Sequence, residues 1–224
     1  MTTEERIPES LLRHIRRDLR PVRPLSAPGR RALRLVPLAV ALCLMVPAWW
    51  GWRSNFDALG PLGGWGLSAA QSLLGLVVAG LALREAVPGR LLPAGAIAAA
   101  SAAAVLMVVA NTMATQWVAP TTVAPGAWGR IAWECFDIAW LSGVPAVGVV
   151  VWLAGRTGPG RPALAGALAG LAAALMTDAG TRLFCAVSSP GHVLVSHGGA
   201  IAALVALGAA VSVVLDRTQA GSAP

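Results

Sequence analysis

Long apolar stretches separated by short breaks run through most of the chain. A bilayer core of about 30 Å needs about 20 helical residues to cross it, and six stretches come close to or reach that length. They cover residues 32–50, 66–83, 91–113, 132–154, 163–185 and 193–215. Prolines and glycines, where an apolar helix can end, fill the breaks at 60–64, 88–90, 120–129, 158–160 and 190–191. The pattern predicts an all-α fold, a polytopic membrane bundle of six transmembrane helices.

The composition agrees with a membrane protein. Of the 224 residues, 56% are hydrophobic and only 12% are charged, and the mean hydropathy is +0.68, whereas a soluble domain has about 25% charged residues. The net charge of +7 could indicate nucleic-acid binding, but the arginines cluster ahead of the first apolar stretch, so we expect no direct nucleic-acid contact. That stretch begins too late and is too long for a signal peptide, which predicts a retained anchor.

The arginines also predict an orientation. With both termini in the cytoplasm, fourteen of the 17 basic residues lie on the inner side, and only Arg53, Arg130 and Arg182 lie on the outer side. Such a bias is what the positive-inside rule expects of a multi-pass protein of the bacterial inner membrane. Most tryptophans then fall near the outer interface, where indoles tend to lie; these are Trp49, Trp50, Trp52, Trp65, Trp117, Trp128 and Trp133.

Residues 1–31 form the predicted cytoplasmic segment, followed by a transmembrane domain over 32–215 and a cytoplasmic tail over 216–224. An apolar helical stripe runs through the segment and consists of Ile7, Leu11, Leu12, Ile15 and Leu19. Proline restricts the residue before it, so an extended linker follows, made of Arg20, Pro21, Val22, Arg23, Pro24 and Leu25. Two interpretations stay open: the arginines bind anionic lipid, or the stripe docks into a groove of a cytoplasmic protein.

Two cysteines fall at matching depths on the outer side, Cys135 at the start of the fourth span and Cys185 at the end of the fifth. Asp178, His192 and His197 lie close by in the predicted topology. Ionisable groups inside a membrane are functional candidates, and thiolates with imidazoles suit soft metals. A disulfide requires Cα atoms about 4.4–6.8 Å apart, which helix rotation decides. We therefore predict a paired role for the two thiols, with the acid and the histidines as accessory ligands.

Enzymatic signatures are missing from the sequence. It contains no Cys-x-x-Cys, no His-Glu-x-x-His and no phosphate-binding glycine loop, which argues against the enzyme classes that those motifs define. Gly166 and Gly170 lie four apart, a spacing that lets helices approach closely in lipid, and we expect a contact inside the bundle more than a dimer face. The sequence predicts neither an enzyme nor a cofactor, and it contains no pattern that fixes an oligomeric state.

The chain resembles the NrsF-type membrane anti-sigma factors, six-span proteins that restrain an extracytoplasmic-function (ECF) sigma factor. The resemblance rests on residues 18–25 (DLRPVRPL), on Trp133 and Cys135, and on 184–197 (FCAVSSPGHVLVSH). It implies that residues 1–31 hold the sigma factor in the cytoplasm. It also implies that Cys135 and Cys185 respond to metal or oxidant stress.

Three hypotheses follow. The first is a non-catalytic regulator whose outer thiols control release of a sigma factor. The second is a membrane thiol enzyme or small-solute carrier that uses the same thiols, Asp178 and the histidines. The third is a structural membrane protein whose basic helix touches only lipid.

Overall fold

The computed structural model describes residues 8–10, 13, 26–121, 127–156 and 158–221. Helices form most of this part of the chain, and it contains no strand. In chain order the elements are α2 (Pro28–Leu33), α3 (Val36–Trp50), α4 (Phe56–Pro61), η1 (Leu62–Gly66), α5 (Leu67–Glu85), α6 (Ala94–Val118), α7 (Trp128–Gly155), α8 (Pro162–Phe184), α9 (Pro190–His192), η2 (Val193–Gly198) and α10 (Gly199–Gly221).

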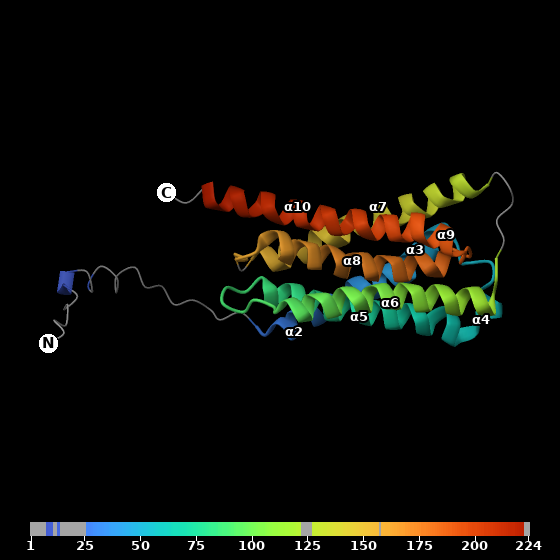
Figure 1. Ribbon diagram of the computed structural model, residues 1–224, viewed down its shortest axis with the longest axis horizontal. Helices are drawn as coiled ribbons and strands as arrows, with labels where there is room; N and C mark the ends of the chain where they lie inside the picture. The colour runs from blue at the N-terminus through green and yellow to red at the C-terminus, as the bar shows by residue number, and fades with distance from the viewer. Residues whose placement is uncertain (1–7, 11–12, 14–25, 122–126, 157, 222–224) are drawn as a thin grey trace.

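Six helical stretches are long and apolar enough to cross a membrane, which confirms the predicted fold class. They are Pro28–Trp50, Phe56–Glu85, Ala94–Val118, Trp128–Gly155, Pro162–Phe184 and Pro190–Gln219. The long helices lie side by side along the longest axis of the molecule (Figure 1). α8 is the central helix, since it packs against α3, α5, α7 and α10, and 78% of its span is buried compared with 17% for α6.

Small residues bring α8 and α10 into close contact. A Cβ atom added at Gly166 would lie 2.3 Å from the carbonyl oxygen of Gly208, and one at Gly170 would lie 2.4 Å from that of Leu204. The backbones therefore meet with no room for a side chain, as small residues permit in membrane helices. The predicted contact within the bundle is confirmed.

We expect Gly166→Ala to destabilise the protein by about 1–3 kcal/mol, the usual cost of overpacking, because the new methyl group would meet the Gly208 backbone. Gly148→Ala is the matched control, since a Cβ atom there meets nothing within 4 Å. Thermal unfolding of both variants in detergent measures the difference. Equal melting temperatures for the two variants would contradict the close contact.

The predicted break at 60–64 is confirmed at Gly60, where the backbone leaves the helical conformation, although helix resumes directly after it. The predicted break at 190–191 is wrong, because a helix begins at Pro190. The chain kinks at Gly60, whose φ of 64° suits glycine, but the π-helical turn η1 carries the helix on into α5. Pro190 begins α9 at a position where its missing N–H is not needed, and η2 continues into α10. The second and sixth spans are consequently longer than predicted.

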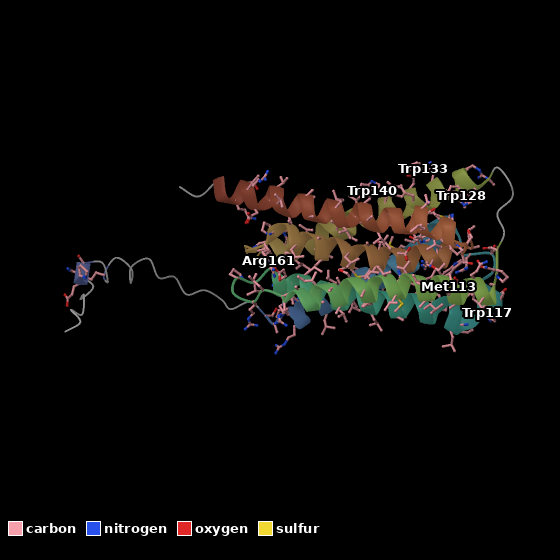
Figure 2. All side chains as sticks on the ribbon, viewed as in Figure 1. Met113, Trp117, Trp128, Trp133, Trp140 and Arg161 are labelled. Atoms are coloured by element: carbon pink, nitrogen blue, oxygen red, sulfur yellow. The ribbon has the colours of Figure 1, made fainter. Side chains whose placement is uncertain are left out.

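The two ends of the bundle differ in their side chains. Trp117, Trp128 and Trp133 lie at one end, here named the tryptophan end, and Arg161 lies at the opposite end (Figure 2). All three indoles are exposed, as expected for rings at a membrane interface. Arg161 forms a bidentate ion pair with the buried Glu85, with N–O distances of 2.5 and 2.8 Å, which ties the end of α5 to the start of α8.

Candidate functional site

Four side chains meet inside the tryptophan end of the bundle: Cys135, Cys185, His192 and His197. Cys135 comes from α7, Cys185 directly follows α8, and the two histidines come from α9 and η2. All four are buried, and one potential ligand atom from each lies within 4.8 Å of the others. The structure thus brings together both cysteines and both histidines that the sequence singled out.

The thiols form the centre of this cluster. The Cys135 Sγ lies 3.2 Å from the Cys185 Sγ, with the Cys135 thiol as the donor, and the two are not joined by a disulfide. The Cys185 Sγ is also 3.3 Å from Nε2 of His192. From this distance the two sulfur atoms can approach each other to form a disulfide, whose bond is about 2.03–2.05 Å long. Alternatively, they can both bind one metal ion.

Each imidazole uses Nδ1 for a partner outside the cluster. Nδ1 of His192 lies 3.5 Å from the Ser196 hydroxyl, and Nδ1 of His197 lies 2.5 Å from the Asp178 carboxylate. The Nε2 atom of His197 is buried and has no hydrogen-bond partner among the described residues. Both rings therefore keep Nε2 for the interior of the cluster.

Asp178 lies behind His197 and outside the group of four. Its second oxygen accepts hydrogen bonds from Gln71 at 2.6 Å and from Arg182 at 3.0 Å. Gln71 accepts in turn from the Asn111 side chain at 2.9 Å. A buried polar network of this kind links α8 to α5 and α6, and it orients Asp178 toward the histidine.

Arg182 and Arg53, which the sequence analysis placed on the outer side, have buried structural roles that it did not predict. Both are buried, Arg182 because it pairs with Asp178 and donates to the Thr112 hydroxyl. Arg53 donates to the carbonyl groups of Arg182 and Ala186, an arginine cap of the α8 carboxyl end. Burial lowers the pKa of Arg53 to about 10, which still leaves its guanidinium charged at neutral pH.

The segment that carries Cys185 is fixed from several sides. The Thr121 hydroxyl donates to the Ala186 carbonyl at 3.0 Å and accepts from the Ser188 N–H at 3.2 Å. The Ser188 hydroxyl donates to the Gln116 side chain at 2.9 Å. Contacts from the end of α6 therefore hold Cys185 against α7, so that the thiols are pre-positioned.

The residues predicted to bind a partner lie outside the described part of the chain. They are Leu11, Leu12, Ile15, Leu19, Arg20, Pro21, Val22, Arg23, Pro24 and Leu25. Sequence reasoning also missed two residues of the buried network, Gln71 and Arg182. A single glutamine inside an apolar stretch was the available signal for Gln71, because a lone polar side chain in lipid requires a partner.

Fold and site together define a multi-pass α-helical membrane protein with a buried thiol–imidazole cluster near one end. The family model described as "Negative regulator of sigma F" (NrsF) matches residues 16–217. The chain belongs to the NrsF family, and it is a negative regulator of a sigma factor. Comparison with curated proteins and with solved structures gave no match.

Proposed function

We propose that the protein is an inner-membrane anti-sigma factor that holds an ECF sigma factor with residues 1–31 in the cytoplasm. Cys135 and Cys185 face the other side of the membrane and sense metal or oxidant stress. The observation that carries the proposal is the thiol pair, 3.2 Å apart, at the end of the bundle opposite to Arg161 and α2 (Figures 1 and 2).

The amino-terminal segment has the chemistry of a protein-docking helix. Its apolar stripe suits a hydrophobic groove, and its arginines suit an acidic rim. In this proposal the Arg-Pro-Val-Arg-Pro sequence at 20–24 serves as a stiff linker, because proline restricts its own backbone and that of the residue before it. A stiff linker would pass a movement of α2 on to the docking helix.

Coupling between the two ends runs through α8 and α5 in this proposal. Asp178 on α8 bonds to Gln71 on α5, so a change at His197 acts on α5. The other half of α5 packs against α2, where a Cβ atom at Gly80 would lie 3.7 Å from the Ala32 methyl group.

Arg31 on α2 donates a hydrogen bond to the Leu153 carbonyl of α7. A shift of α5 relative to α7 would move α2 and release the sigma factor. The protein would then have two states, one that holds the sigma factor and one that releases it, and the sensor would shift the equilibrium between them.

The proposal is tested by co-purification. The full-length protein in detergent, co-expressed with each ECF sigma factor of the source organism in turn, is expected to retain one of them. Deletion of residues 1–24 is expected to abolish that binding, because it removes the docking stripe. Deletion of residues 220–224 is the control and should leave binding intact. Failure of the full-length protein to retain any of these sigma factors, or equal retention without residues 1–24, would overturn the proposal.

A further inference from the structure

We infer that Cys135, Cys185, His192 and His197 form a four-coordinate site for one thiophilic divalent cation of the zinc class. The inference deepens the proposed function, on which it rests for its biological meaning, by naming what the outer site binds. Four arguments support it: the geometry of the ligand atoms, their outer partners, the charge balance and the nature of the donor atoms.

The geometry suits a small tetrahedral ion. Zinc forms bonds of about 2.3 Å to sulfur and about 2.0–2.1 Å to nitrogen. In a tetrahedral site with these bond lengths, neighbouring ligand atoms lie about 3.3–3.8 Å apart. The observed separations are 3.2 Å between the sulfur atoms and 3.3 Å from Cys185 to His192. All four ligand atoms lie within 4.8 Å of one another. Shifts of less than about 1.5 Å would therefore complete the tetrahedron around an ion.

The outer partners are those of metal-binding imidazoles. A histidine that binds a metal nearly always donates its other ring N–H to a carboxylate, carbonyl or similar group, which fixes its tautomer. His197 has this arrangement, because Asp178 occupies Nδ1 and the buried Nε2 has no hydrogen-bond partner in the part of the chain that the structure describes. An unsatisfied polar atom in the interior is energetically unfavourable. A bond from Nε2 to a metal would remove this cost.

Charge balance favours a divalent ion. Binding converts the thiols of Cys135 and Cys185 to thiolates and releases two protons, and the two thiolates cancel a charge of +2. Among the neighbouring charges, Asp178 and Arg182 already form an ion pair at 3.0 Å. A site with no net charge avoids the large desolvation cost of an isolated ion in a membrane interior. A monovalent copper ion would leave one uncompensated negative charge.

The donor atoms exclude the hard cations. Magnesium and calcium take oxygen ligands, and none of the four clustered atoms is an oxygen. Both oxygens of Asp178 are already used by His197, Gln71 and Arg182, so this carboxylate acts as a positioning residue. Two sulfur and two nitrogen ligands are instead a common set for zinc.

Cobalt(II) titration of the reduced full-length protein in detergent tests the site. One equivalent is expected to produce a thiolate-to-cobalt charge-transfer band with the intensity of two thiolates, together with the visible bands of tetrahedral cobalt. Zinc should displace the cobalt. Cys135→Ser and Cys185→Ser should each remove at least half of the charge-transfer intensity, whereas Cys43→Ser, the matched control, should leave it unchanged. Circular dichroism and gel filtration establish that each variant is folded.

Asp178→Asn tests the positioning role. Zinc affinity, measured by competition, should fall about 10–100-fold, the usual effect of losing an outer-shell partner, while the tetrahedral spectrum is retained.

Absence of a charge-transfer band in the wild-type protein, or a band that survives both serine variants, would overturn the site. An unchanged affinity in Asp178→Asn would overturn the role of the carboxylate. These measurements involve no sigma factor, so their failure is distinguishable from failure of the co-purification experiment.

Discussion

Replacement of Asp178 by leucine is expected to lower the free energy of unfolding by about 3–5 kcal/mol, the cost of removing one partner from a buried ion pair. Arg182 would remain buried with its charge uncompensated, and the Gln71 amide would lose its acceptor at 2.6 Å. The same change would free Nδ1 of His197. A single substitution thus removes three hydrogen bonds in a part of the bundle that water does not reach.

Thermal unfolding in detergent measures this loss. Asp137→Asn is the control, because Asp137 is an exposed acid on α7, and it should change stability by less than about 0.5 kcal/mol, as surface substitutions usually do. The pair Asp178→Asn and Arg182→Gln removes both charges and keeps polar side chains, so it should be less damaging than Asp178→Leu alone. A stable Asp178→Leu protein would show that the network does not hold α8, α5 and α6 together.

The sequence was sufficient for the six-span architecture because span length is a property of local composition. Six apolar stretches of nearly 20 residues allow few alternatives, since lipid requires every backbone group to be satisfied within a helix. Prolines and glycines were less reliable guides to the boundaries. The backbone leaves the helical conformation at Gly60 but helix resumes directly after it, and Pro190 begins a helix, so neither residue separates two spans.

The site could be predicted only in part, because it depends on how the helices rotate about their axes. Matching depth placed Cys135 and Cys185 near the same level, but their contact at 3.2 Å requires both helices to turn those faces inward. Small residues decide that rotation: Gly166 and Gly170 set α8 against α10. The buried Gln71 and Arg182 follow from the same rotation, and for this reason the sequence pattern did not reveal their role.

Simultaneous replacement of Cys135 and Cys185 by serine is expected to abolish the response of the sigma factor to its inducer. The hydroxyl groups cannot form a disulfide, and neutral hydroxyls are poor ligands for a zinc-class ion. A reporter gene under a promoter of the bound sigma factor measures the response to zinc and to a thiol oxidant. Wild-type cells should show induction by at least one of the two inducers, and the double variant should show the same expression with and without either inducer. Cys43→Ser is the control, since Cys43 lies apart from the cluster and contacts Ser72, and it should respond as the wild type does.

Histidine variants separate the two kinds of signal. His192→Ala and His197→Ala each remove a nitrogen ligand but leave the two sulfur atoms able to form a disulfide, because oxidation needs only the thiols. If the physiological signal is the metal, the histidine variants should lose the zinc response and keep any response to oxidant. If the signal is oxidation, they should respond to oxidant normally, and zinc should not induce the wild type. Full induction of the double cysteine variant by zinc or oxidant would exclude both forms of sensing, because no thiol would remain at the outer end to receive either signal.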